Sequence, residues 1–303
     1  MITQFSKILL VGGSGTLGKV TDPLLMQAGY QIRLMTRHPE KISLTQSSDV
    51  EIVKGDLIDP SSLEIACEGR DVVIAMAHSI LGTGRYGSMK VDVEGHKSLI
   101  DIAKRTGVKC MVYISLVGAG PDQSIDFWRN KYEVEQYLQK SGLNFIIIRS
   151  TAFMETHIHE LMGKGILKNG KAMIMGKGNN PLNFVSVVDV AQIILKSIEQ
   201  PEALNSIIEI GGSDNLSRNE IVTLYEKYSG KKVKCTYLSI GFLNTMSRLF
   251  KPFHQGISRV MALGEVLDKT DQTFDPYSTL EKFPIQLTTP EHFVQKQCNR
   301  HVV

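Results

Sequence analysis

The feature that most constrains this chain is a glycine-rich turn directly after its first apolar run. Ile8–Val11 has the length and composition of a buried strand, and it leads into Gly12–Gly18, which reads GGSGTLG and opens a helix-period segment. Glycines at positions 12, 15 and 18 allow a tight turn, a close approach of backbone to a diphosphate, and close packing of helix on sheet. The helix N-terminus then offers free N–H groups to phosphate. A Walker A loop is excluded, because no Gly-Lys-Ser/Thr follows.

Strand and helix signals alternate through the first half of the chain. Apolar runs of strand length recur at Lys7–Val11, Gln31–Thr36, Val50–Lys54, Asp71–Ala75, Cys110–Ser115 and Phe145–Arg149. Segments of helical period lie between them at Leu17–Ala28, Ser61–Glu68, Met89–Thr106 and Phe127–Ser141. This alternation predicts an α/β protein with a Rossmann-type doubly wound parallel sheet. Ligands of such sheets bind at the carboxyl ends of the strands.

Local signals place several helix boundaries. Asp59 followed by Pro60 is typical of a helix start, and Ser217 with Glu220 has the spacing of a capping box. Glycines just past helix ends are expected in left-handed conformation; they are Gly29, Gly69, Gly107 and Gly142.

The pattern changes after Arg149. We expect residues 1–150 to form the dinucleotide-binding core, with the sheet completed by about 184–211. The segments 151–183 and 212–303 are expected to form a smaller, discontinuous substrate lobe. Asp189 is expected to cap the helix that follows Phe184–Val188.

The second predicted strand indicates which dinucleotide is bound. An NAD site places an acidic residue at the end of this strand, whereas this chain has Thr36–Arg37 there, with Lys41 shortly after. A guanidinium can bind a ribose 2′-phosphate that a carboxylate would repel. NADP(H) is therefore expected in preference to NAD(H), the alternative being that Arg37 is only a solvated loop cation.

Further cofactor contacts are expected along the same sheet edge. Asp56 can accept a hydrogen bond from an adenine amino group, or it can simply cap the next turn. The small residues after the fourth strand would let the cofactor lie against backbone. The residues of this edge expected to bind cofactor are Gly12, Ser14, Gly15, Thr16, Leu17, Gly18, Arg37, Lys41, Asp56, Leu57, Ala75, Met76 and Ala77.

Composition excludes several other classes of protein. A formal net charge of +3 is too small to indicate nucleic acid binding, and no apolar run approaches the ~18 residues of a membrane span. The four cysteines have no paired spacing for zinc or a redox dithiol, and His157 and His159 do not have the spacing of a zinc site. We expect a cytoplasmic protein without a metal.

The motifs resemble those of the short-chain dehydrogenase/reductase superfamily, and within it the atypical NmrA-like branch, which includes isoflavone-reductase-like and quinone-reductase-like proteins. The resemblance rests on residues 12–18, Arg37 with Lys41, residues 55–57, 91–109, Ser115, 131–149 and 183–191. It covers about the first 200 residues well and the last 90 or so loosely.

The resemblance implies an active site that this chain has only in part. The superfamily uses Tyr-x-x-x-Lys preceded by Ser, and Lys131 and Ser115 match the lysine and the serine. The resemblance implies that Lys131 binds the cofactor by holding the nicotinamide ribose, the alternative being that it is an ordinary surface lysine of its helix. Phe127 stands at the tyrosine position and has no proton to donate. Tyr132 cannot replace it, because adjacent helical residues point about 100° apart. The resemblance also places Phe153 and Met154 near the nicotinamide or in an apolar pocket, although ordinary core packing is an equal alternative.

Three functions follow from this combination. The first is NADP(H)-dependent hydride transfer to an apolar, quinone-like or conjugated small molecule. The second is a non-enzymatic NADP(H)-binding redox sensor, regulatory or assembly protein. The third and weakest is an NAD-dependent sugar-nucleotide epimerase. Residues 240–267 have the pattern of a basic amphipathic helix and are expected to close one wall of the substrate pocket or to contact a protein partner or membrane surface.

Overall fold

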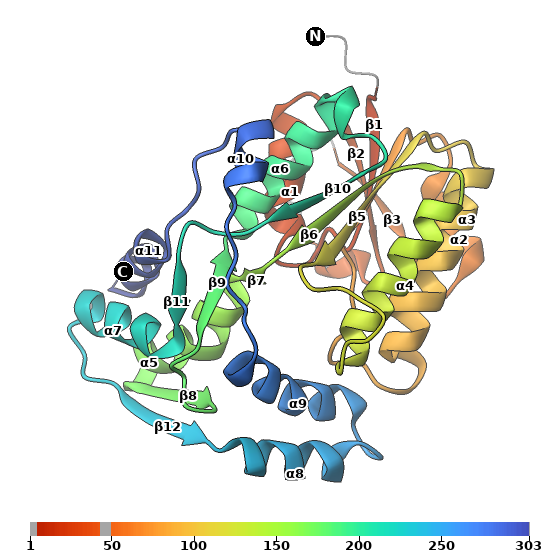
Figure 1. Cartoon of the computed structure of the whole chain (residues 1–303). Helices are drawn as coiled ribbons and strands as arrows, with labels where there is room; N and C mark the ends of the chain where they lie inside the picture. The colour runs from red at the N-terminus through yellow and green to blue at the C-terminus, as the bar shows by residue number, and fades with distance from the viewer. Residues whose placement is uncertain (1–4, 43–49, 303) are drawn as a thin grey trace. The chain divides into compact units, whose positions relative to one another are not determined.

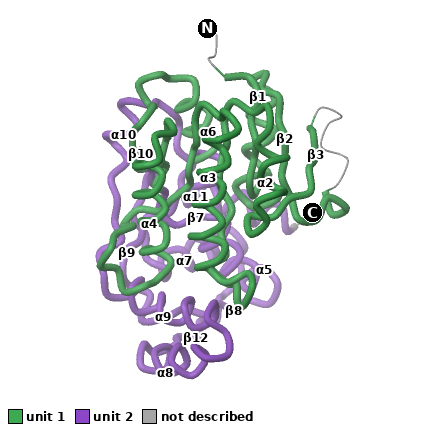
Figure 2. The backbone as a smooth tube through the Cα atoms, turned by 90° about the vertical axis from the view of Figure 1, so that its right-hand side faces the viewer, with its two compact units in different colours: residues 1–149, 190–209 green, residues 150–189, 210–303 purple. Residues whose placement is uncertain are grey.

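A computed structural model describes residues 5–42 and 50–302 (Figure 1). The chain divides into two compact units, coloured separately in Figure 2. Unit 1 comprises Met1–Arg149 and Val190–Glu209, and unit 2 comprises Ser150–Asp189 and Ile210–Val303.

Unit 1 is built on a seven-stranded sheet in the order β10-β6-β5-β4-β1-β2-β3. Its strands are β1 (Lys7–Val11), β2 (Gln31–Thr36), β3 (Glu51–Lys54), β4 (Val72–Ala75), β5 (Cys110–Leu116), β6 (Asn144–Ser150) and β10 (Ser206–Ile210). The central pairs β3–β2, β2–β1, β1–β4 and β4–β5 are parallel. This order is that of a doubly wound dinucleotide-binding sheet, so the predicted fold class is confirmed.

Helices cover both faces of this sheet (Figure 1). They are α1 (Gly18–Gln27), α2 (Pro60–Cys67), α3 (His96–Arg105), α4 (Asp126–Lys140) and α6 (Val187–Glu199), with short helices η1 (Pro39–Lys41), η2 (Gly84–Tyr86) and η5 (Pro201–Ala203) and a π-helical turn pair η3 (Met89–Gly95). Helices α2, α3 and α4 share one apolar core with the strands, while α1 and α6 lie on the other face in Figure 1. The helical stretch predicted over Met89–Thr106 is therefore confirmed, with its first part π-helical (η3) and its second part α-helical (α3).

The predicted boundary signals act as expected. The Asp59 side chain accepts a hydrogen bond from Ser61 N, with Pro60 as the first helical residue of α2. Ser217 and Glu220 form both hydrogen bonds of a capping box. Gly29 and Gly107, which follow α1 and α3, have φ of 90° and 81°.

Unit 2 contains two small sheets and several helices. Its strands are β7 (Ala152–Phe153), β8 (Lys171–Met175), β9 (Pro181–Val185), β11 (Asn215–Ser217) and β12 (Lys234–Leu238). Its helices are α5 (Lys164–Asn169), α7 (Arg218–Ser229), α8 (Ile240–Phe250), α9 (Gln255–Lys269), α10 (Tyr277–Lys282) and α11 (Pro290–Val302), with the π-helical segment η4 (Glu155–Gly163). Its core joins η4, α5, α7 and α11 to β8 and β9.

Two expectations for this part of the chain need correction. Strand β9, expected to complete the large sheet, pairs with β7 and β11 instead, and only β10 returns to the large sheet. The amphipathic stretch 240–267 is not one helix but the hairpin of α8 and α9, because the segment between Phe250 and Gln255 turns back through Pro252.

Candidate functional site

The carboxyl ends of four neighbouring strands in unit 1 leave the sheet at the same level. Val11 of β1 is in register with Met35 of β2 and with Ala75 of β4, and Ala75 is in register with Tyr113 of β5. The residues that follow these four positions therefore begin a common edge. Most of the predicted cofactor residues of the first half lie at or just after these strand ends, and Asp56 and Leu57 follow the neighbouring strand β3.

Gly12 and Gly18 both occupy positions that no other residue fits. Gly12 has φ of 91°, and a Cβ on it would lie 2.6 Å from the backbone nitrogen of Ala77. A Cβ on Gly18 would collide with the backbone of Gly13. The loop after β1 is thus folded tightly on itself and against the chain that leaves β4.

The middle of the loop is open. Ser14, Gly15 and Thr16 are exposed, whereas Leu17 and Gly18 are buried beneath them. A Cβ on Gly15 would meet only Gly12 O, at 3.2 Å. Helix α1 starts at Gly18 and no side chain caps it. This arrangement fits the diphosphate of a dinucleotide, which needs bare backbone and helix N–H groups.

Arg37 follows β2 at the same edge. Its guanidinium carbon lies 4.7 Å from the centre of the Tyr86 ring, and that of Arg85 lies 5.8 Å from the same ring. Stacking on an aromatic ring orients a guanidinium and leaves its in-plane donors available. Arg37 and Lys41 are both exposed. Tyr86 and Arg85 were missed from the sequence, because they come from a loop some 50 residues later in the chain.

Asp56 follows β3 and is half-buried. Its Oδ1 accepts a hydrogen bond from Ile58 N at 3.3 Å, which is the turn-capping contact. Leu57, Ala75 and Met76 are buried, and Ala77 is half-buried beside the loop that carries Gly12.

Lys131 is a buried lysine on α4, with 4% of its surface exposed. Its Nζ donates to Ile114 O at 2.8 Å and lies 4.7 Å from the centre of the Tyr113 ring. An ammonium group has three N–H donors, so Lys131 can keep this bond and also donate to a ligand. Lys131 is therefore not the exposed surface lysine of the alternative interpretation.

The charge state of Lys131 is set by two opposing effects. Burial lowers its pKa, and the carboxylates of Asp92 and Glu135 raise it, with a net value of about 8. His96, which packs edge-on against Tyr113 at 5.3 Å, has its pKa lowered to about 3 by burial and by Lys131. At neutral pH this pocket therefore holds an ammonium beside a neutral imidazole.

Asp92 is held by a buried hydrogen-bond network. Its carboxylate accepts from Ser88 Oγ at 2.5 Å and from Ser79 N at 2.7 Å, and Asn130 Nδ2 donates to Ser88 Oγ at 2.9 Å. Glu135 is fully buried and receives two bonds from the Arg149 guanidinium, at 3.0 and 2.6 Å. Sequence reasoning missed these residues. The only signal for Asp92 was a carboxylate between Val91 and Val93 on a helical segment.

Phe127 and Ser115 lie close to this lysine. Phe127 is buried in the first turn of α4, with its ring centre 5.8 Å from Lys131 Nζ and 5.9 Å from the ring of His78. Ser115 is 3% exposed, and its Oγ has no hydrogen-bond partner among the described residues. A buried hydroxyl without a partner is costly, which favours a ligand group that completes it. Tyr132 is half-buried on the same helix.

Several predicted residues belong to unit 2. Phe153 is half-buried in β7, opposite Val185 of β9. Asp189, expected to cap α6, lies in the first turn of that helix, which begins at Val187, and its carboxylate accepts from Thr288 N and Oγ1 at 2.8 and 2.9 Å. The pKa of His157 is lowered to about 4 by burial and by Arg218.

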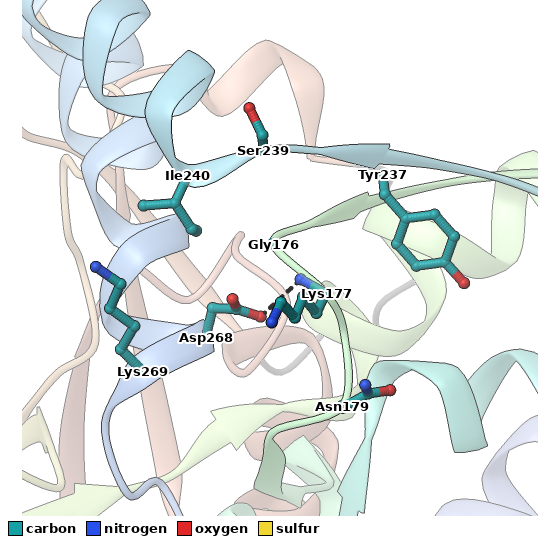
Figure 3. A pocket seen from close by; sticks show the side chains of 8 residues that line it. All are labelled: Gly176, Lys177, Asn179, Tyr237, Ser239, Ile240, Asp268 and Lys269. Atoms are coloured by element: carbon teal, nitrogen blue, oxygen red, sulfur yellow. Dashed lines mark hydrogen bonds between the residues drawn. The ribbon is translucent and has the colours of Figure 1, made fainter.

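Unit 2 also has an open pocket of about 760 Å³, shown in Figure 3. Asp268 within it accepts from the backbone nitrogens of Lys177 and Gly178, at 2.9 and 3.3 Å, and lies 3.5 Å from Arg218. Its carboxylate thus fixes the loop after β8. The lining residues are Gly176, Lys177, Asn179, Tyr237, Ser239, Ile240, Asp268 and Lys269.

Neither a metal-binding cluster nor a membrane-spanning helix is present in the described part of the chain. No group of three or more His, Cys, Asp or Glu side chains there could hold a metal ion. None of the described helices is both long and apolar enough to cross a membrane.

Comparison with known proteins places the chain in a family. A model of the NmrA-like family matches residues 4–289. The chain belongs to the NmrA-like family. The resemblance inferred from the motifs is therefore confirmed, and the match extends well into the last 90 residues, where the motifs were loose.

The proteins that resemble this NmrA-like chain have names that give different functions. Photosystem II assembly factor Ycf39 of Trieres chinensis is 27% identical over 291 residues, 93% of this chain and 89% of that protein. The Escherichia coli quinone oxidoreductase QOR2 complexed with NADPH has a TM-score of 0.78 at 22% identity, covering 95% and 99% of the two chains. The Citrobacter triphenylmethane reductase complexed with NADP(H) has a TM-score of 0.78 at 21% identity, covering 97% and 100%.

Proposed function

We propose that this chain binds NADP(H) at the carboxyl edge of the unit 1 sheet and transfers hydride to a small apolar acceptor. One juxtaposition carries the proposal: the open glycine loop after β1 and the guanidinium of Arg37 after β2 leave adjacent strands at one level. The loop would hold the diphosphate, and Arg37, with Lys41 nearby, would hold the ribose 2′-phosphate. The adjacent strand end has no carboxylate that would favour NAD(H).

The residues around α4 would position the nicotinamide end. Lys131 would donate to the ribose hydroxyls while it keeps its bond to Ile114 O. Ser115 Oγ has a hydrogen bond to offer. When bound, NADPH supplies a hydride from C4 of its nicotinamide.

The acceptor is proposed to be quinone-like or conjugated. Phe127 cannot donate a proton where the superfamily uses tyrosine, so the chain favours a substrate whose reduction needs little help from a protein acid. The two named reductases of similar fold support this class of acceptor, since one is a quinone oxidoreductase and the other reduces triphenylmethane dyes.

Turnover is tested by following NADPH oxidation with a panel of quinones, enones and triphenylmethane dyes. We expect oxidation above background with at least one acceptor, and slower oxidation of NADH. Absence of turnover with every acceptor would contradict the catalytic part of the proposal and leave cofactor binding to be tested separately.

Cofactor choice is tested by Arg37→Ala. Loss of a charge-assisted bond to phosphate is worth about 1.5–3 kcal/mol, so NADPH affinity should fall roughly ten- to over a hundredfold while NADH affinity changes little. Isothermal titration calorimetry measures both. Arg105→Ala, which removes an exposed arginine of α3 paired with Glu64, is the matched control and should change neither. Equal losses for both cofactors in Arg37→Ala would contradict the role of Arg37.

A second candidate is an NADP(H)-binding assembly or regulatory protein without turnover. Phe127 at the tyrosine position favours it, and so does the similarity to relatives named as photosystem II assembly factors. Its test is NADPH binding without oxidation of any acceptor, together with a protein partner whose affinity differs between NADPH and NADP⁺. An active reductase whose partner binding ignores the cofactor would exclude it.

A further inference from the structure

Helix α8 has two apolar faces, and only one of them is covered within unit 2. The covered face packs on α9: Leu243 is fully buried, and Gly264 of α9 lies so close that a Cβ on it would come within 2.6 Å of Leu243 Cδ1. Asn244 Nδ2 donates to Glu265 at 2.8 Å, and Ser247 Oγ donates to Ser258 O at 2.8 Å. These contacts fix the orientation of α8.

The other apolar face of α8 is exposed. Phe242 is 50% exposed and Leu249 is 58% exposed. They lie seven residues apart, which is two helical turns, with Met246 between them on the same side. Phe253, in the turn after α8, is 80% exposed, and Phe253 N donates to Phe250 O at 2.9 Å. We call Phe242, Met246, Leu249 and Phe253 the α8 stripe.

The segment of sequence that contains the stripe is rich in positively charged residues. From Lys227 to Gly264 there are seven Lys and Arg residues and no Asp or Glu. Without these seven cations the formal net charge of the chain would be −4 rather than +3. Arg248 and Lys251 are exposed next to the stripe, and neither has an ion-pair partner among the residues that the structure describes.

The strand before α8 extends this cationic surface. β12 pairs in parallel with β8, and the exposed residues Lys234 and Lys171 are opposite each other in that pair. Two like charges at a paired position are unfavourable within a protein unless an anion lies near. The apolar stripe therefore belongs to a segment whose surroundings attract anions.

We propose that the α8 stripe is a docking surface for the face of an anionic lipid bilayer. An interfacial helix combines exposed aromatic and aliphatic side chains on one side with flanking Lys and Arg, and anionic head groups attract each such cation. A neutral apolar groove of another protein would match the stripe but would leave Arg248 and Lys251 without counter-charges. The inference uses unit 2 alone and stands whether or not the proposed function is correct.

The test is flotation of the full chain with vesicles of phosphatidylcholine and with vesicles in which phosphatidylglycerol replaces a third of it. We expect the protein to float with the phosphatidylglycerol vesicles and not with phosphatidylcholine alone. Raising the salt from ~0.1 to ~1 M should release it, because the screening length falls from about 10 to 3 Å.

Variants assign the contact to the stripe. Leu249→Ser with Phe253→Ser should weaken vesicle binding at least tenfold by removing the apolar contact, and Arg248→Glu with Lys251→Glu should do the same by reversing the charge. The matched control is Ile65→Ser with Leu161→Ser, which removes two similarly exposed apolar side chains from other elements. All three variants should melt with the wild type, since the side chains are exposed.

Three outcomes would overturn the proposal. The wild type could fail to bind either kind of vesicle at low salt. The stripe variants could bind vesicles as the wild type and the control do. Self-association that is lost in Leu249→Ser with Phe253→Ser, without any vesicle binding, would show by sedimentation that the stripe docks a second copy of the chain instead.

Discussion

Helix α4 buries charged and amide side chains, whereas helix α8 exposes aromatic and aliphatic ones. On α4, Asn130, Lys131 and Glu135 are each at most 5% exposed. On α8, Phe242 and Leu249 are at least half exposed. Both helices depart from the usual pattern of polar outside and apolar inside, in opposite senses.

The two helices differ in where the partners of their unusual side chains lie. The buried groups of α4 have partners in unit 1: Lys131 donates to Ile114 O, Asn130 to Ser88, and Glu135 accepts from Arg149. The exposed groups of α8 have no such partners within unit 2. A buried charge needs its partners in the folded chain itself. An exposed apolar side chain can instead be covered by another molecule that binds there. The first arrangement suits a preorganised site, and the second suits a docking surface.

The largest expected effect tests whether the charges of α4 depend on their partners. Arg149→Ala should lower the free energy of unfolding by about 3–5 kcal/mol, because the fully buried carboxylate of Glu135 would lose both of its bonds to Arg149. Urea denaturation measures it. Lys97→Ala, which removes an exposed ion pair with Glu133, should cost less than about 1 kcal/mol. Equal costs would mean that burial on α4 does not make its ion pair more important.

The second test separates the two apolar faces of α8. Leu243→Ala should lower the free energy of unfolding by about 2–4 kcal/mol, because it leaves a cavity against α9. Leu249→Ala removes the same atoms from the exposed face of the same helix and should change it by less than about 0.5 kcal/mol. The same denaturation experiment compares them. A large cost for Leu249→Ala would show that the stripe is part of the fold rather than a free surface.

The smallest effect concerns the titration of Lys131. In the proposed function Lys131 donates to the nicotinamide ribose. NADPH affinity should therefore fall as the pH rises through about 8, because Lys131 then loses its positive charge. Asp92 raises the pKa of Lys131, so Asp92→Asn should move this fall to lower pH by about one unit.

Calorimetric titration of NADPH from below neutrality to alkaline pH checks this behaviour. Asp101→Asn, which removes a carboxylate that binds Tyr137 at the surface, is the control and should leave the profile in place. A profile that Asp92→Asn does not move would separate Asp92 from the function of Lys131.

The fold and the carboxyl edge of the sheet, where cofactor binding is proposed, were predictable because their signals are local. Strand lengths, the alternation of strand and helix, and the spacing of Gly12 to Gly18 all lie within short stretches of sequence. The register of Val11 with Met35 then follows from the parallel sheet. The position of Arg37 was predictable for the same reason, since it directly follows the strand next to the loop.

The surroundings of the two unusual helices were decided by tertiary structure alone. Asp92 of η3 and Tyr113 of β5 act on Lys131 from other elements, and no spacing in the sequence shows that they lie near it, whereas Glu135 lies four residues from Lys131 on the same helix. The amphipathic pattern of residues 240–267 predicted an apolar helical face, but it did not predict the hairpin of α8 and α9. Which of its apolar residues are covered depends on where α9 turns back, and that is fixed by contacts such as Gly264 with Leu243. The sequence by itself determined the sheet and the glycine loop after β1, because each depends on neighbours in the chain. Only the folded chain decided which charges are buried and which apolar side chains stay exposed, because both depend on residues that are distant in sequence.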